Sequence, residues 1–190
     1  MRVIGTILFS IFIILIFSCE TVEHHHVPKT ANEALKELME GNQRYVNNVP
    51  MHHDCIDEAH HSEKDQHPHT FVLSCIDSRV PPEIVFDQGI GNLFVARVAG
   101  NIEDPNILGS MEYAVQVKGT KLLVVLGHSN CGAVQGAIDN VNLGHLTQLT
   151  NQIKVAFSHH RTYPLPEHLS NEAGRLNVLS TIDHILSSSQ

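Results

Sequence analysis

The sequence predicts an α/β domain whose strands are mostly parallel. Three short runs, 70–75, 92–98 and 121–127, are almost continuously apolar, as strands buried on both faces of a parallel sheet are. Segments in which apolar residues recur at helical spacing lie between and after these runs. The chain has 190 residues and shows no internal repeat, so its length fits one domain behind an N-terminal targeting segment.

The first 19 residues are typical of an export signal. Arg2 precedes a nearly continuous apolar run, residues 3–17, which is short for a membrane span and fits a secretory signal. The run ends in "IFSC", which resembles a bacterial lipobox whose cysteine, here Cys19, is lipidated; a plain signal peptide or an uncleaved anchor would use the same run. We expect a lipoprotein-like signal at 1–19, a polar tether at 20–31 and a single domain at 32–190. The protein would then be exported and periplasmic, anchored to the membrane by its lipid.

Local patterns predict the elements of the domain in order. Thr30 and Glu33 have capping-box spacing, and apolar residues then recur at helical spacing, which predicts a helix over about 32–46. Residues 47–69 have no period and are expected to form a loop. The strand at 70–75 is followed by a turn with one short helical piece in 80–91 and by the strand at 92–98. The remaining pattern predicts a helix at 106–118, a strand at 121–127 and helical segments at 131–138, 146–157 and 170–186.

Side chains with metal-binding chemistry follow two of the predicted strands. Cys75 ends the run 70–75, and His128 and Cys131 follow the run 121–127. Because sites in parallel sheets lie beyond the carboxyl ends of the strands, we expect these three side chains to meet. Two thiolates and one imidazole suit Zn²⁺, and a catalytic zinc often has three protein ligands and one open position.

Asp77 and Arg79 complete the first of these two motifs. Asp77 is close enough to Cys75 to serve as a fourth ligand in a closed state or to leave that position. Arg79 could hold the carboxylate when it leaves, since a guanidinium pairs bidentately with a carboxylate. A closed structural metal site, a redox pair or inert core cysteines would use the same cysteines. The lack of a CxxC pair disfavours the first two, and the polar neighbours disfavour the third.

These motifs resemble those of a known family. "CIDSRV" (75–80) and "GHSNCGAV" (127–134) are similar to the zinc motifs CxDSR and HxxC of the β-class carbonic anhydrases, and the resemblance covers roughly residues 30–187. It implies Zn²⁺ on Cys75, His128 and Cys131, with Asp77 and Arg79 as the catalytic dyad. It also implies reversible hydration of CO₂ to bicarbonate and a proton, by a homodimer or a dimer of dimers.

The same resemblance sets an expectation for the sheet. It implies four or five mostly parallel strands flanked by helices. Family members typically continue past "LSSSQ" with more helix and a final strand, so we expect the C-terminal strand to be missing from this chain.

Other functions remain open on the sequence alone. The formal net charge of −8 and the lack of a basic run argue against binding nucleic acid. The segment 51–69 carries six histidines and Cys55, so a metal-binding surface protein is one alternative, and a solvated polar loop is the simpler explanation of the same segment. A catalytically weak or inactive homologue that keeps the zinc site is another alternative.

Overall fold

The computed structural model describes residues 27–51, 53–157 and 169–189. The predicted export signal, Cys19 and most of the predicted tether lie outside the described residues, so the structure leaves those expectations untested. Within the described ranges, no helix has the length and apolar character needed to cross a bilayer.

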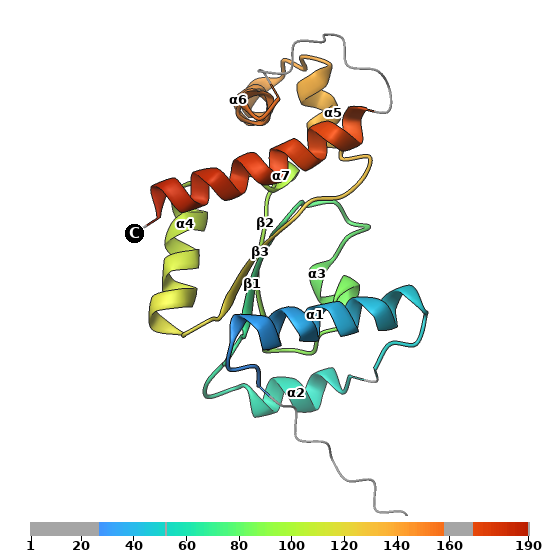
Figure 1. Ribbon diagram of the computed structural model, residues 1–190, viewed down its shortest axis with the longest axis vertical. Coiled ribbons are helices and arrows are strands. Elements are labelled where there is room, and N and C mark those ends of the chain that lie inside the picture. Colours follow the sequence, from blue (N-terminus) through green and yellow to red (C-terminus); the bar gives the residue numbers. More distant parts are fainter. Residues whose placement is uncertain (1–26, 52, 158–168, 190) are drawn as a thin grey trace, which may run out of the picture.

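A parallel sheet forms the centre of the domain (Figure 1). In the described residues it has three strands in the order β2-β1-β3, with β1 at Thr70–Ser74, β2 at Leu93–Arg97 and β3 at Leu122–Leu126. β1 is buried at every position, as its central place requires, and pairs in register with both neighbours. The three predicted strands and their parallel arrangement are confirmed. The resemblance implied four or five strands, and the described residues contain three.

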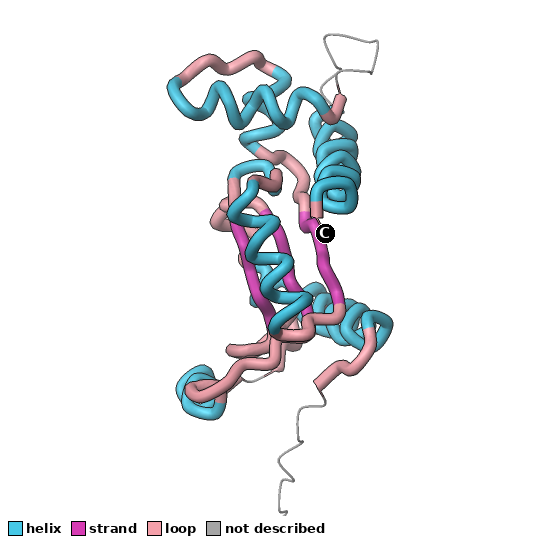
Figure 2. The backbone as a smooth tube through the Cα atoms, turned by 90° about the vertical axis from the view of Figure 1, so that its left-hand side faces the viewer, coloured by secondary structure: helices cyan, strands magenta, loops and turns pink. Residues whose placement is uncertain are grey.

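The helices begin and end close to the predicted residues. The bounds are α1 Ala31–Val46, α3 Pro82–Val85, α4 Pro105–Glu112, α5 Gly132–Ile138, α6 Gly144–Val155 and α7 Leu169–Ser188. The predicted helix at 106–118 is α4 followed by a π-helical turn, Tyr113–Val117, and a 3₁₀ turn, Ala99–Asn101, follows β2. Figure 2 shows α4 lying along one face of the sheet. At the start of α1 the Thr30 side chain accepts a hydrogen bond from the Glu33 N–H, as the capping-box spacing predicted.

The expectation of a loop throughout 47–69 is wrong, because residues Cys55–His61 form helix α2. No residue of α2 is buried, so the helix leaves no apolar period in the sequence. Polar groups hold the helix in place. Asp54 caps its first turn by accepting a hydrogen bond from the Asp57 N–H. Glu58 accepts a hydrogen bond of 2.8 Å from the N–H of Ile90, in the segment before β2.

Helix α1 packs closely on the segment that follows α3. A Cβ on Gly41 would lie 1.8 Å from the Phe86 carbonyl oxygen, so only glycine allows this approach. The contact brings Arg44 to Asp87, which is buried and has a positive φ of 48°. The two side chains form an ion pair at the amino-terminal end of the strands.

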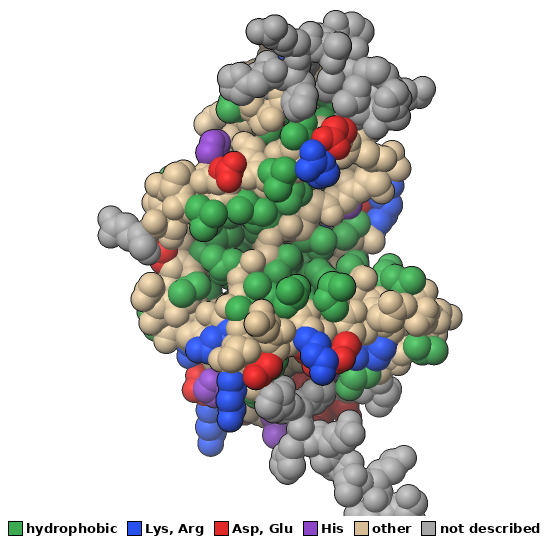
Figure 3. All heavy atoms as spheres, viewed as in Figure 1, with side chains coloured by type: hydrophobic (Ala, Val, Ile, Leu, Met, Phe, Trp, Pro, Cys, Tyr) green, Lys and Arg blue, Asp and Glu red, His purple; other side chains and the backbone are tan. Residues whose placement is uncertain are grey.

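Apolar side chains also gather on the surface. Figure 3 shows them across the middle of one face, between α7 and α1, along the edge of the sheet where β3 lies. Large apolar side chains are exposed on all three elements; they include Leu35 and Met39 of α1, Leu123 of β3, and Leu179 and Leu186 of α7.

Candidate metal centre

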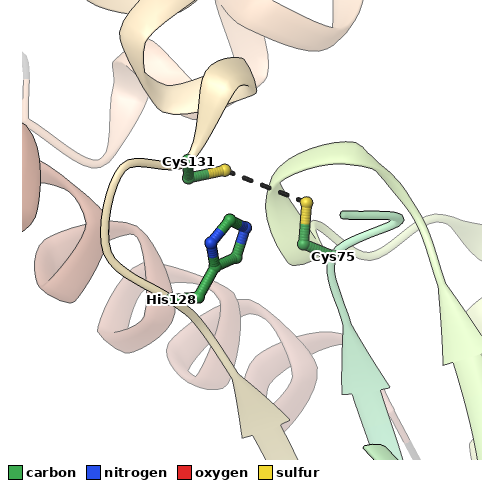
Figure 4. A group of neighbouring side chains, drawn as sticks. All are labelled: Cys75, His128 and Cys131. Atoms are coloured by element: carbon green, nitrogen blue, oxygen red, sulfur yellow. Dashed lines mark hydrogen bonds between the residues drawn. The ribbon is translucent and has the colours of Figure 1, made fainter. Parts of the chain in front are cut away.

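The strand order places one crevice between the ends of β1 and β3. The chain leaves β1 for β2 on one side and later returns to place β3 on the other side, so the connections diverge at β1. Ligands of open α/β sheets bind outside the carboxyl ends of the strands at such a point. Cys75 directly follows β1, and His128 and Cys131 follow β3 (Figure 4). Cys75 was expected to be the last residue of the strand, but β1 ends one residue earlier, at Ser74.

The three predicted ligands meet in the crevice. The ligand atoms of Cys75, His128 and Cys131 all lie within 4.8 Å of one another, and they form the single such group among the described residues. The two sulfur atoms are 3.9 Å apart. In a tetrahedral zinc site with Zn–S bonds of about 2.3 Å, two sulfurs lie about 3.8 Å apart. The donor set and its spacing therefore fit Zn²⁺.

The imidazole of His128 is oriented for metal binding. Its Nδ1 lies 2.9 Å from the Ser129 carbonyl oxygen, so Nδ1 carries the proton and donates it. The other nitrogen, Nε2, then keeps its lone pair, and it is buried without a hydrogen-bond partner in the part of the chain that the structure describes. A buried polar atom of this kind is costly unless something binds it. Carbonyl groups hold zinc-binding histidines in this way in other proteins.

The two thiols are arranged so that one of them ionises first. The pKa of Cys75 lies well below its usual range because the Cys131 thiol donates a hydrogen bond to it. The Gly100 N–H, 3.4 Å from Cys75 Sγ, acts in the same direction, while burial opposes the shift. The pKa of Cys131 is raised because its thiol donates to Cys75 and because it is buried beside that negative charge. Without a cation, the negative charge of one sulfur therefore opposes ionisation of the other. A bound divalent cation would remove this repulsion, since coordinated thiols are deprotonated.

Asp77 lies beside this group, paired with Arg79. The Arg79 guanidinium donates to both carboxylate oxygens, at 2.8 Å and 2.7 Å, and the Arg79 backbone N–H donates to Oδ1 at 3.0 Å. These bonds hold the pKa of Asp77 far below its usual range, so the carboxylate is ionised. Asp77 Oδ2 is 3.8 Å from His128 Nε2. In this structure the carboxylate faces the centre while Arg79 holds it.

Contacts far apart in the sequence support the two motifs. Arg79 Nη2 lies 3.4 Å from the Asn130 carbonyl oxygen and so connects the first motif to the second. Helix α7 packs against the start of the second motif so closely that a Cβ on Gly127 would lie 2.6 Å from a methyl group of Val178. Asn177 of the same helix donates a buried bond of 2.7 Å to the Gly100 carbonyl oxygen.

The sequence did not reveal these supporting residues. Gly100 and Arg97 lie within the stretch that resembles the family, but nothing in their spacing assigned a role to either. The N–H of Gly100 and the side chain of Arg97 act on Cys75 from the end of β2, which only the folded sheet brings near.

The histidine-rich segment forms no second centre among the described residues. His53 lies between two carboxylates, with Nδ1 2.9 Å from Glu58 and Nε2 3.5 Å from Asp87, so its two nitrogens face different partners. His61 lies 3.4 Å from Asp57 on exposed α2. His53 therefore belongs to the group of charges around Asp87, and His61 makes a surface contact within its own helix.

Comparison with known proteins agrees with this geometry. The family model described as "Carbonic anhydrase" matches residues 70–190. Carbonic anhydrase 2 of Mycobacterium tuberculosis is 46% identical over 114 residues, which are 60% of this chain and 55% of that protein. The carbonic anhydrase of Mycolicibacterium smegmatis is 44% identical over the same shares. The chain thus spans about half the length of the curated relatives it matches.

Solved structures show the same fold. A tetrameric β-carbonic anhydrase of Sordaria macrospora aligns with a TM-score of 0.62 at 24% identity, over 82% of this chain and 81% of that chain. The Coccomyxa β-carbonic anhydrase, solved with acetazolamide, aligns with a TM-score of 0.64 at 24% identity, over 81% and 72%. Since the family model matches well over half of the residues, this chain belongs to the carbonic anhydrase family, and its fold is that of the β class.

Proposed function

We propose that this protein is a zinc-dependent carbonic anhydrase that catalyses the reversible hydration of CO₂ to bicarbonate and a proton. The observation that carries the proposal is the convergence of Cys75, His128 and Cys131 beside an Asp77 carboxylate held by Arg79. Family membership supports it independently. Zinc, when bound by the two cysteines and the histidine, would supply a Lewis acid that makes a water molecule nucleophilic near neutral pH.

The protein's own groups have separate roles in this reaction. Asp77 is ionised and can only accept hydrogen bonds, so it would orient the attacking water by accepting a hydrogen bond from its O–H group at Oδ2, the oxygen that faces His128. Arg79 keeps that oxygen in place and lowers the pKa of the carboxyl group further. The Ser129 carbonyl fixes the His128 ring, so that the same nitrogen always faces the centre.

Stopped-flow measurement of CO₂ hydration by the full chain, with zinc measured in the same preparation, tests the proposal. We expect one tightly bound zinc per chain and a rate far above that of buffer. One zinc per chain without catalysis would identify an inactive homologue. Several zinc or copper ions per chain would favour the metal-binding surface protein instead.

We also propose that the protein acts as a homodimer or as a dimer of dimers. The fungal structure that shares its fold is described as tetrameric, which supports an oligomer, and the apolar face in Figure 3 is of a kind found at subunit contacts. Analytical ultracentrifugation at micromolar concentration should show a species of two or four chains. A single-chain species across the concentration range would count against this assembly.

Export as a periplasmic lipoprotein, with signal 1–19, tether 20–31 and domain 32–190, is the remaining proposal about this chain. Its support is the apolar run that ends at Cys19. The variant Cys19→Ala should release the protein from the membrane fraction, because the anchor would be covalent. Substitution of Cys55, which lies on exposed α2, is the matched control and should leave the membrane pool unchanged. A Cys19→Ala variant that stays in the membrane would point to an uncleaved anchor.

A further inference from the structure

Arg97, the last residue of β2, reaches across to the segment that carries Cys75 and Asp77. Its Nε donates to the Cys75 carbonyl oxygen at 2.9 Å, and its Nη2 donates to the Asp77 carbonyl oxygen at 2.5 Å. One planar guanidinium therefore joins two backbone carbonyls that lie two residues apart. Among the described residues, both hydrogen bonds of this side chain go to this segment.

The bonds occur where the sheet can no longer hold the chain. The pairing of β1 with β2 ends at Ser74, whose carbonyl accepts from the Val98 N–H at 3.0 Å. The next residue is Cys75, and from there the segment turns away, with the Val80 N–H donating to the Asp77 carbonyl at 3.1 Å. The Arg97 side chain thus supplies to the Cys75 carbonyl the hydrogen bond that a neighbouring strand would otherwise provide.

Two arginines therefore hold Asp77 from different sides. Arg79 binds its carboxylate, and Arg97 binds its backbone carbonyl. Because Arg97 also binds the Cys75 carbonyl, a movement of the Asp77 backbone is coupled to the backbone of Cys75. Gly100, three residues after Arg97, adds a bond of 3.4 Å from its N–H to the Cys75 sulfur itself.

We propose that Arg97 is a positioning residue of the metal centre: by bridging the Cys75 and Asp77 carbonyls it sets the direction of the Cys75 sulfur and the place of the Asp77 carboxylate together. The proposal rests on the proposed function only for its effect on turnover. Its effect on metal geometry follows from the contacts alone. Groups that orient metal ligands typically change metal affinity or activity by 10- to 100-fold when removed.

The test compares Arg97→Met, which keeps the length of the side chain but no donor, with Arg97→Lys, which has a charge but no planar pair of donors. Arg44→Met is the matched control, because Arg44 likewise makes two side-chain hydrogen bonds to a distant segment, to the carboxylate and the carbonyl of Asp87, but at the other end of the strands. For each variant we would measure zinc affinity by chelator competition, the visible absorption spectrum of the Co²⁺-substituted protein, and CO₂ hydration.

We expect Arg97→Met to bind zinc about 10-fold more weakly, to change the cobalt spectrum and to lose at least about 10-fold in activity. Arg97→Lys should lie between this variant and wild type. Arg44→Met should lower the melting temperature and leave zinc affinity and the cobalt spectrum unchanged.

Wild-type zinc affinity and cobalt spectrum in Arg97→Met would overturn the proposal. If that variant does not fold, Arg97→Lys decides, and wild-type values in it would overturn the proposal equally. A wild-type protein without turnover would refute the proposed function, while the zinc and cobalt measurements would still test Arg97.

Discussion

Two aspartate–arginine pairs lie at opposite ends of the same sheet and are built differently. Asp77 and Arg79 are two residues apart, beside the metal ligands at the carboxyl ends of the strands, and the Arg79 side chain is 64% exposed. Asp87 and Arg44 are 43 residues apart, at the amino-terminal ends, and the Asp87 side chain is only 4% exposed. The local pair joins neighbouring residues of one segment and is free to serve chemistry, whereas the distant, more deeply buried pair fastens α1 to the segment that follows α3.

A search for the functional site by cavity size would point to the amino-terminal ends of the strands, away from the metal-binding group. A cavity of about 670 Å³ lies beside Asp87 and is lined by apolar residues such as Tyr45, Ile84 and Leu93. Large apolar pockets are the usual first hypothesis for a ligand site. Yet the convergent thiols and imidazole lie at the other end, after β1 and β3. The side-chain chemistry at the switch point is therefore better evidence than volume in this protein.

The largest expected effect comes from the metal ligands. Substituting Cys75, His128 or Cys131 by Ala should abolish tight zinc binding and reduce CO₂ hydration to the rate of buffer, because each variant removes one of three ligands. Zinc per chain after dialysis, measured by mass spectrometry, checks this. Cys55→Ala is the control, since Cys55 is exposed and outside the centre. Stoichiometric zinc in any of the three ligand variants would contradict the assignment.

The next effect separates the two pairs by function. Arg79→Ala should keep one zinc per chain but lower CO₂ hydration by roughly 100-fold, because the Asp77 carboxylate loses the bonds that keep it in place. Arg79→Lys should recover part of the activity, since an ammonium cannot make both planar bonds. Rates should be measured between pH 6 and 9 with zinc determined in parallel. Wild-type rates in Arg79→Ala would show that Asp77 and Arg79 do not act as a catalytic dyad.

The buried pair should instead govern stability and its dependence on pH. Burial alone would raise the pKa of Asp87, but the Arg44 guanidinium and the Met51 N–H outweigh it and lower that pKa. A carboxyl whose pKa is lower in the folded state stabilises the protein above its ordinary pKa of about 3.9, and this stability is lost as the pH falls through the folded-state pKa.

The variant Asp87→Asn tests this assignment. It should lower the free energy of unfolding by about 2 kcal/mol at pH 7, because a charged hydrogen-bond partner is lost. The difference from wild type should shrink toward zero as the pH is lowered below 4. Urea unfolding at several pH values measures it, and a constant difference across pH would show that the charge of Asp87 is not responsible. Zinc content should stay at the wild-type level.

The smallest expected effect concerns α2, beside the same pair. Asp54→Ala removes the side chain that caps this short exposed helix and should destabilise it by about 1 kcal/mol. Hydrogen exchange of the amides in 55–61 should become faster, while that of β1 should not change. Equal acceleration in both elements would mean that α2 opens only when the whole domain unfolds.

Much of this protein could be predicted from local patterns. The strands are continuous apolar runs because parallel strands are buried on both faces, and β1 is buried at all five positions. Their parallel order then brings the residues after β1 and β3 together, so Cys75, His128 and Cys131 could be identified as a group before any distance was known.

Tertiary structure alone decided the contacts between distant residues. Helix α2 buries none of its residues, so no period could reveal it. The pairing of Arg44 with Asp87 depends on the close approach of α1 at Gly41, and the bonds of Arg97 depend on the register of β2 beside β1. A sequence pattern records which face of an element is apolar, whereas the partner of a polar side chain is set by where other elements come to lie. For that reason the proposed ligands could be identified from the sequence, and the groups that hold them in place could not.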